Sequence, residues 1–460
     1  MVRTILLDMT ICGFKCIDNP ITIKFTNKTI NKNVLNKPQI KAIYGTNGEG
    51  KSAIVHSIDV YRKTIIDDSF LTVQSANGAL IEIINKKLKK ASISVRYIVC
   101  FMDDNSDKEE HILCNHTISY AIDNDKKVYI EKEELSIKGK IIFGNNISRL
   151  VYKINRGNIE YLNDEFFNDL TEEVKDRTKN LLTKASLLYY LVLDTDFFLN
   201  IDKKDKAKYT QLFTNSLLIT FFALNTRVYL DEKDSHIIKS DKIRRILKEN
   251  TFLAETDRSL AAENYDIAVD HEIDEIDKKD LPHYKEAVAR ICDFLKIFKP
   301  GLKEIQVDAS SVSNNKYRCK KTLVYEDGNR ISSEFESSGI KKLMKLYPVL
   351  GVLEYGGIAF IDEFDSNIHD VYLCKIIEYV LYFTQGQLVF TTHNLGPMEV
   401  LDDKGIKHSI DFINKSRISS WKRNGNYSVV KVYRGGAIPN CPFNIDSADF
   451  VRAFGEKRKD

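Results

Sequence analysis

The octapeptide at residues 45–52, Gly-Thr-Asn-Gly-Glu-Gly-Lys-Ser, constrains the fold of this chain most strongly. It matches G-x-x-x-x-G-K-[ST], in which glycines let backbone N–H groups approach phosphate oxygens at the positive end of the next helix. The mostly apolar run Ile40–Tyr44 precedes it, and a helical pattern runs from Ser52 to about Ile66. These flanks favour a phosphate-binding loop over a chance glycine-rich turn. The residues predicted to bind a nucleotide are Gly45, Asn47, Gly48, Gly50, Lys51 and Ser52, with Lys51 on the β- and γ-phosphates and Ser52 on Mg²⁺.

A second motif is an apolar strand that ends in two acids. Ile358–Ile361 predicts a buried strand, and Asp362 and Glu363 follow it directly. Ligands of open α/β sheets gather at that end of the strands. We therefore expect Asp362 to hold Mg²⁺ and Glu363 to polarise an attacking water. Taken alone, such a strand is common, but the phosphate loop favours the functional interpretation.

Two further elements complete a pattern. His393 follows the predicted strand Gln387–Phe390, where an imidazole can hydrogen-bond a γ-phosphate. The polar turn at residues 336–339 opens a predicted helix, Gly339–Leu350, and by itself is a plausible N-cap. Strands alternating with helices in this region predict a parallel α/β sheet.

In their order, the four elements resemble the ABC-type ATPases of the SMC, RecF and overcoming-lysogeny-defect group. The resemblance implies an α/β fold: a P-loop ABC-type head with a mixed sheet and a helical insertion between phosphate loop and signature. It assigns Ser337 and Gly339 to the signature that contacts the γ-phosphate bound by an opposite protomer. It also implies a catalytic role for Glu363, a switch role for His393, and ATP with Mg²⁺ as cofactors.

The chain has one phosphate loop and one signature, so two copies are needed to complete two sites, and we expect a homodimer or higher homo-oligomer. The pattern departs from the family in two places. The signature lacks the leading Leu and trailing Gln, and Gln74 is the nearest, insecure candidate for a glutamine loop. We therefore expect ATP hydrolysis to be slow.

The sequence predicts three regions: an ATPase lobe with the phosphate loop (1–162), a helical insertion (163–297) and a second ATPase lobe (298–460) with signature, acidic strand and switch histidine. In the insertion, the acidic run Glu263–Asp280 predicts a solvated loop, with a docking surface for a basic partner as the alternative. We also expect a late hairpin of Ile410–Ile413 with Tyr427–Tyr433. Sustained heptads are missing, which argues against coiled-coil arms.

Composition narrows the functional classes. A formal net charge of +3 is nearly balanced and does not by itself indicate a nucleic-acid partner. No apolar stretch has the length of a membrane span, and the N-terminus lacks a secretory pattern, so a cytoplasmic location without membrane contact is expected. The eight cysteines form no C-x-x-C pair. His111, Cys114 and His116 cluster only loosely, without a fourth metal ligand.

Too few residues follow His393 for the toprim nuclease of overcoming-lysogeny-defect proteins. The chain therefore resembles the stand-alone ATPase subunits of bacterial anti-phage systems such as PARIS, and of Septu or retron-associated modules. The resemblance implies a sensor and scaffold that controls a separately encoded nuclease or toxin, with DNA or a phage protein as trigger. A RecF- or SMC-like DNA-repair ATPase that binds duplex DNA is the alternative. A single-chain nuclease would need a further acidic cluster, for which Asp402-Asp403 is the late candidate.

Overall fold

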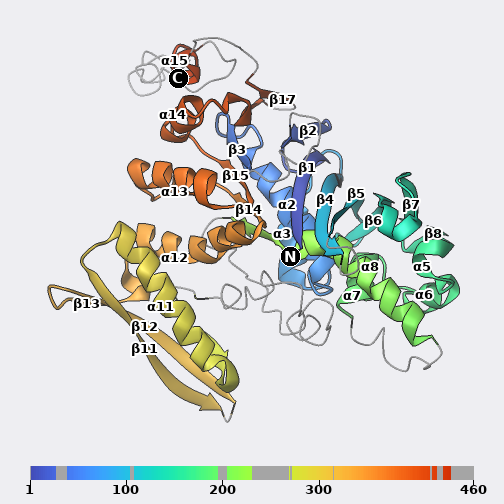
Figure 1. The fold of residues 1–460 in the computed structure, drawn as a ribbon, viewed down its shortest axis with the longest axis horizontal. Coiled ribbons are helices and arrows are strands. Elements are labelled where there is room, and N and C mark those ends of the chain that lie inside the picture. The colour runs from blue at the N-terminus through green and yellow to red at the C-terminus, as the bar shows by residue number, and fades with distance from the viewer. Residues whose placement is uncertain are drawn as a thin grey trace, which may run out of the picture.

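The computed structural model describes residues 2–26, 39–103, 108–194, 205–230, 269, 272–313, 315–414, 417–421 and 428–436. Their strands form three sheets of seven, six and four strands (Figure 1). The sheets and the helices between them confirm the predicted α/β class. Among the described helices, none combines the length and the apolar character that a bilayer crossing requires.

The six-stranded sheet is central and mixed. Its order is β17-β16-β3-β15-β14-β9, and all neighbours are parallel except the antiparallel pair β16 and β17. The strands are β3 (Gln39–Tyr44), β9 (Thr226–Tyr229), β14 (Ile358–Ile361), β15 (Gln387–Thr391), β16 (Ile410–Asn414) and β17 (Arg417–Ser420).

The prediction of a late hairpin is right for its first strand and wrong for its second. β16 pairs with β17, whereas the segment expected as its partner contains helix α15 (Val429–Arg434). The buried side chains of Val429, Val430 and Tyr433 recur at helical rather than alternating spacing. Ser428 caps this helix by accepting a hydrogen bond from the Lys431 N–H at 3.4 Å.

Both faces of the central sheet are covered. In β14, Ile358 and Phe360 point into one apolar core, and Ala359 and Ile361 point into a second. A parallel strand buried on both faces reads as a continuous apolar run, which is why residues 358–361 were recognisable. The second core contains the helices α11 (Leu281–Phe298), α12 (Ser338–Gly351), α13 (Asp370–Phe383) and α14 (Gly396–Asp403), with the short 3-10 helices η4 (Ser333–Phe335), η5 (Val352–Tyr355) and η6 (Lys407–Ser409) nearby.

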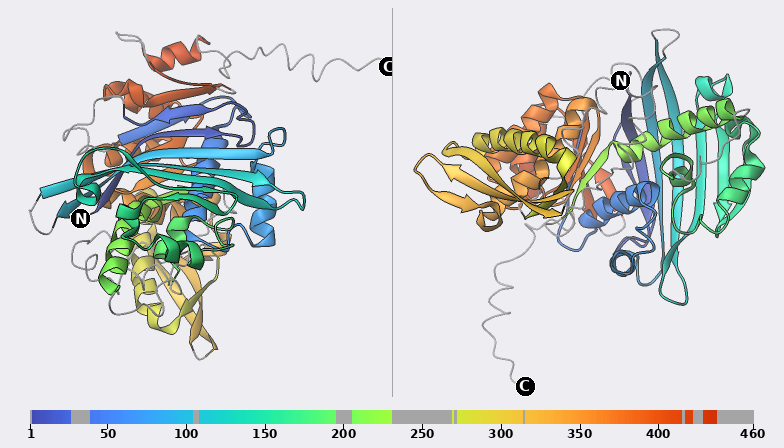
Figure 2. Two further views of the ribbon diagram at one scale, coloured as in Figure 1. Left: turned by 90° about the vertical axis from the view of Figure 1, so that its right-hand side faces the viewer. Right: turned by 90° about the horizontal axis from the view of Figure 1, so that it is seen from below.

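The seven-stranded sheet is antiparallel and encloses the first core together with α2 (Lys51–Ile66), α7 (Leu187–Val192) and α8 (Lys206–Leu224). Helix α2 lies between this sheet and the central one (Figure 2). The strands are β1 (Arg3–Cys12), β2 (Ile21–Lys24), β4 (Lys90–Asp103), β5 (Lys108–Ile122), β6 (Val128–Lys138), β7 (Arg149–Asn155) and β8 (Asn158–Leu162). Short helices border it: α3 (Gln74–Ile83), α4 (Lys140–Phe143), α5 (Asp164–Phe167) and α6 (Thr171–Arg177).

The four-stranded sheet lies at the opposite end of the molecule, with α11 packed on it (Figure 1). It comprises β10 (Asp274–Asp277), β11 (Leu302–Ser313), β12 (Lys316–Tyr325) and β13 (Arg330–Ser332), and the 3-10 helix η3 (Lys278–Asp280) follows β10. The stretch predicted as helical, 163–297, thus also supplies β9 to the central sheet and β10 to this one. Each has four residues, too few to show a period.

The prediction that the acidic run is a solvated loop is wrong for residues 274–277. Residues 274–277 form β10, which pairs with the basic strand β12. Asp274 accepts from the Lys321 ammonium at 2.6 Å, and Glu275 pairs with Arg318 at 3.3 Å. Opposite charges across an antiparallel pair stabilise a strand whose composition disfavours one. Residues 263–268 and 270–271 lie outside the described part of the chain.

Candidate nucleotide-binding site

Three adjacent parallel strands bring three of the predicted elements to one edge of the central sheet. The phosphate loop follows β3, residues 392–393 follow β15, and the acidic pair 362–363 follows β14. Because β3, β15 and β14 are neighbours and run in the same direction, their carboxyl ends meet. This edge is where open α/β sheets bind ligands.

The phosphate loop turns sharply into α2. Gly50, the N-cap, has φ 102°, a left-handed conformation that side chains disfavour. Lys51 is buried, and its ammonium donates to the carbonyl oxygens of Gly45 at 2.8 Å and Thr46 at 3.0 Å. Burial lowers the pKa of Lys51, against the raising effect of Asp362 and other nearby carboxylates.

The remaining loop residues surround the N-terminus of α2. Asn47 and Gly48 are exposed, Gly45 is buried, and Ser52 lies half-buried in the first helical turn. Unpaired N–H groups at this end of a helix, together with its dipole, favour an anion.

One hydroxyl organises the acidic pair. Thr391, at the end of β15, donates from Oγ1 to Asp362 Oδ1 at 2.5 Å and accepts from the Glu363 N–H at 2.8 Å. Asp362 is 9% exposed, whereas Glu363 is exposed and has φ 46°. Thr391 was not among the residues predicted for the site. A hydroxyl residue that closes an otherwise apolar strand beside an acidic one was the available signal.

His393 is exposed at the same edge, and its backbone N–H donates to Asp365 Oδ2 at 3.3 Å. Desolvation, and then the positive charge of Lys51, lower the pKa of His393 below its ordinary 6.5, although Asp365 and the acidic pair oppose this. This shift favours the neutral imidazole. Asp365 was also missed, because an acid inside a turn carries no distinguishing pattern.

The signature turn meets the acidic turn of its own chain. Ser337 caps α12 by accepting from the Ile340 N–H at 3.4 Å, and the Ser338 hydroxyl hydrogen-bonds Asn367 Oδ1 at 3.1 Å. A Cβ at Gly339 would lie 2.7 Å from the Asn367 carbonyl oxygen, so only glycine permits this approach. Ser337 and Ser338 are exposed.

The residues at this edge fit a magnesium nucleotide. A buried ammonium and a helix N-terminus suit phosphate oxygens. The Ser52 hydroxyl and the Asp362 carboxylate are the hard oxygen ligands that Mg²⁺ prefers. Their binding roles remain predictions, which the placement on one edge supports.

The side chains of the loose group His111, Cys114 and His116 do not lie on one face of β5. Side chains alternate along β5, so Cys114 and His116 face the first core, whereas His111 faces the other side. There His111, Cys100 and Glu109 hold potential ligand atoms within 4.8 Å of one another. Arg3 already pairs with Glu109 at 2.7 Å, and we assign no metal to a group that holds a cation.

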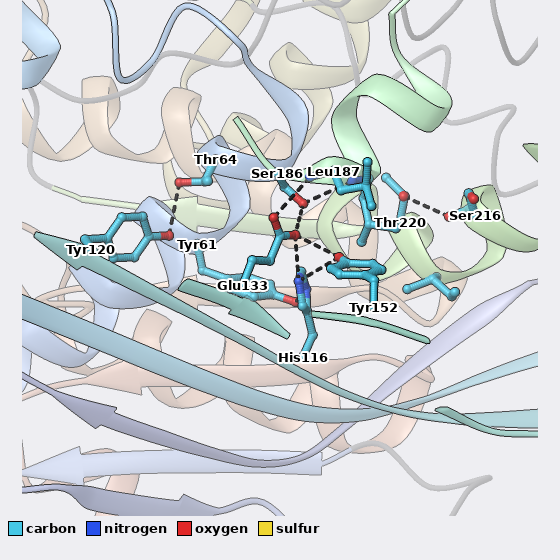
Figure 3. A network of polar contacts seen from close by, with 12 residues as sticks. Tyr61, Thr64, His116, Tyr120, Glu133, Tyr152, Ser186, Leu187, Ser216 and Thr220 are labelled. Atoms are coloured by element: carbon cyan, nitrogen blue, oxygen red, sulfur yellow. Dashed lines mark hydrogen bonds and ion pairs between the residues drawn. The ribbon is translucent and has the colours of Figure 1, made fainter. Parts of the chain in front are cut away.

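His116 belongs to a fully buried network instead (Figure 3). Its Nδ1 hydrogen-bonds the Tyr61 hydroxyl of α2 at 2.8 Å, and its Nε2 lies 3.0 Å from Glu133 Oε1. Glu133 also accepts from the Tyr152 hydroxyl at 2.7 Å and the Ser186 hydroxyl at 2.5 Å. The network joins α2 to β5, β6, β7 and the start of α7.

Comparison with solved structures finds only remote likeness. An Smc head domain with an extended coiled coil, bound to the C-terminal domain of ScpA, from Pyrococcus furiosus, is 12% identical with a TM-score of 0.38, covering 91% of this chain and 96% of that one. A RecF recombination mediator structure is 13% identical with a TM-score of 0.32, covering 91% and 99%. No curated protein matches this sequence.

A family model matches residues 147–399, which include the signature, the acidic strand and His393 but not the phosphate loop. The family is described as AAA domain, putative AbiEii toxin, Type IV TA system. Since the match spans more than half of the 460 residues, the chain belongs to this AAA-domain family.

Proposed function

We propose that this protein binds ATP with Mg²⁺ at the carboxyl edge of the central sheet and hydrolyses it slowly. The observation that carries the proposal is the convergence of the phosphate loop, Asp362, Glu363 and His393 on three adjacent parallel strands. Residues separated by more than three hundred positions in the sequence therefore lie at the same edge of the sheet.

Each side chain has a distinct role. Lys51 and the N–H groups of the loop hold the β- and γ-phosphates, and Ser52 and Asp362 hold Mg²⁺, which neutralises phosphate charge when bound. Glu363 accepts a proton from the water that attacks the γ-phosphorus, and the bond to the bridging oxygen breaks as ADP leaves. The neutral His393 hydrogen-bonds the γ-phosphate.

The signature completes the site of a second copy. Ser337, the N-cap of α12, and Ser338, its first residue, are exposed, so this end of the helix is accessible to another molecule. With one loop and one signature per chain, a head-to-tail dimer closes around two nucleotides. ATP favours the dimer, and hydrolysis releases it.

At the level of biology, we propose that this ATP-dependent assembly is the sensor and scaffold of an anti-phage system and controls a separately encoded nuclease or toxin. The family description, which names a toxin–antitoxin system, supports a two-component arrangement. Binding of duplex DNA by a RecF- or SMC-like repair ATPase is the rival outcome, and the near-balanced charge of +3 weighs mildly against it.

Two measurements test these levels separately. Hydrolysis assays with the wild type, Lys51→Ala and Glu363→Gln test the ATPase. The proposal predicts that both substitutions strongly lower turnover, and equal rates in all three would refute it. Affinity purification from the native host with and without ATP tests the scaffold. A stoichiometric product of a neighbouring gene supports control of an effector, whereas ATP-dependent, salt-sensitive capture of duplex DNA supports the repair alternative.

A further inference from the structure

A buried lysine links the signature helix to the acidic turn. Lys342 lies on α12, one turn beyond the signature, and is 1% exposed. Its ammonium donates to the Glu363 carbonyl oxygen at 2.6 Å and to the Ser366 hydroxyl at 2.5 Å. The same ammonium lies 5.4 Å from the centre of the Tyr229 ring on β9. A charge is kept in such a place only where its partners compensate for lost hydration.

The partner that matters is the backbone of Glu363. Its φ of 46° is unusual for a residue with a side chain, and strain of this kind costs on the order of 1–3 kcal/mol. Such a conformation persists where the surroundings hold it. Here the Glu363 N–H is held by Thr391 and its carbonyl oxygen by Lys342, so both peptide groups that flank its Cα are fixed.

The fixed backbone of Glu363 influences the orientation of its side chain. Glu363 is exposed, and its fixed peptide groups set the direction in which its side chain leaves the backbone. Two further contacts join the same helix to the same turn: Ser338 with Asn367, and the close approach of Gly339 to the Asn367 carbonyl. The signature end of α12 and the acidic turn therefore form one rigid unit.

We propose that Lys342 is a positioning residue for ATP hydrolysis: it holds Glu363 in its left-handed conformation and ties that residue to the signature turn. The inference rests on the proposed function, because it assigns Lys342 a role only if Glu363 assists hydrolysis. Because Lys342 is 1% exposed, we do not assign it a contact with the nucleotide. Its removal affects turnover and leaves binding in place.

The test is Lys342→Met, which keeps most of the unbranched apolar part of the side chain and removes the ammonium. We expect kcat to fall about 10- to 100-fold, since a displacement near 1 Å of a reacting group has effects of that size. We expect KM for ATP to change less than about threefold and ATP-dependent dimerisation to persist, because neither depends on Glu363 orientation. A merely structural role would instead lower stability and kcat and raise KM together.

Lys321→Met is the matched control. Lys321 is also 1% exposed and also lies near a tyrosine, 5.8 Å from the Tyr284 ring centre, but it belongs to the four-stranded sheet. It pairs with Asp274 there. If Lys321→Met lowers kcat as Lys342→Met does, the effect is general destabilisation and the inference fails.

A gentler variant covers the case in which Lys342→Met does not fold. Ser366→Ala removes the contact of the ammonium with the Ser366 hydroxyl and leaves its contact with the Glu363 carbonyl oxygen. We expect a fall of about threefold in kcat at unchanged KM, and a wild-type kcat would contradict the inference.

Combined with Glu363→Gln, neither substitution lowers the residual rate further. If Glu363→Gln itself hydrolyses ATP like the wild type, the proposed function fails. If Glu363→Gln is inactive and Lys342→Met is fully active, only the role of Lys342 fails.

Discussion

Two polar clusters of this protein contain similar side chains but differ in burial and in expected role. The buried cluster around His116 and Glu133 and the exposed edge with Glu363 and His393 each contain a histidine and a glutamate. In the buried cluster both side chains are 0% exposed, and the glutamate accepts hydrogen bonds from Tyr152, Ser186 and the Leu187 N–H. At the edge both side chains reach the surface, and the glutamate backbone is in an unfavourable conformation.

The difference separates stability from chemistry. A satisfied, buried network contributes stiffness and is costly to break, because any partner left behind keeps its desolvation penalty. Charges that converge without full pairing, at a strained backbone, are the usual mark of a functional site. Substitution of the two glutamates is therefore expected to divide cleanly, one affecting turnover and the other folding.

The largest effect is expected at the edge. Glu363→Gln keeps size and hydrogen bonding but cannot accept the proton from water, so kcat for ATP hydrolysis falls about 10²- to 10⁴-fold. The unfolding midpoint stays within a few degrees of the wild type. Phosphate release under saturating ATP measures the first, and thermal denaturation measures the second. A stable variant with undiminished kcat would remove Glu363 from the site.

In the buried cluster, Glu133→Ala leaves His116 and two hydroxyls without their acceptor. We expect the free energy of unfolding to fall by about 3–5 kcal/mol, measured by urea denaturation. Glu134→Ala, on the exposed side of the same strand, is the control and changes it by less than about 0.5 kcal/mol. The fraction that remains folded binds ATP normally. If Glu133→Ala is stable and loses ATP binding instead, the comparison between the clusters is wrong.

Thr391→Val sharpens the comparison, since Thr391 is the buried support of the exposed edge. The variant keeps the shape of the side chain and removes both hydrogen bonds, to Asp362 and from the Glu363 N–H. We expect a loss of about 1–3 kcal/mol in stability and about tenfold in kcat. If stability falls and kcat does not, Thr391 contributes to folding only, like the residues of the buried cluster.

The smallest effect concerns pH. Because the pKa of His393 lies below 6.5, the folded state disfavours the protonated form. Its contribution to stability is therefore present above pH 6.5 and is lost as pH falls through the folded-state pKa. We expect the hydrolysis rate at saturating ATP to be level from pH 8 to 7 and to decline below 6.5. In His393→Gln that decline is shallower, and an identical decline in both proteins would exclude His393 as its source.

Much of the central sheet could be predicted from sequence. β14 is buried on both faces and α2 starts at a glycine-rich loop, so Ile358–Ile361 and the helix ending at Ile66 were recognisable locally. The meeting of loop, acids and His393 followed from strand–helix alternation. The site roles themselves remain predictions, as do the three proposed regions.

What sequence could not supply are features fixed by distant partners. β10 is acidic, and its pairing with the basic strand β12 stabilises it. Thr391, Asp365 and Lys342 act through contacts with the acidic turn. Their spacing in the sequence does not predict these contacts. The late helix α15 was predicted as a strand because Val429 and Val430 favour strands locally, whereas packing of Tyr433 decides otherwise.

The most direct test of the nucleotide site is calorimetric titration of the wild type and Lys51→Ala with ATP and Mg²⁺. The account predicts saturable binding of one ATP per chain by the wild type and an affinity at least about tenfold lower in Lys51→Ala, since a charge-assisted hydrogen bond is worth about 1.5–3 kcal/mol. The Lys51→Ala protein should retain the melting temperature of the wild type within a few degrees. Equal affinity of the two folded proteins for ATP would contradict the placement of a nucleotide at this edge.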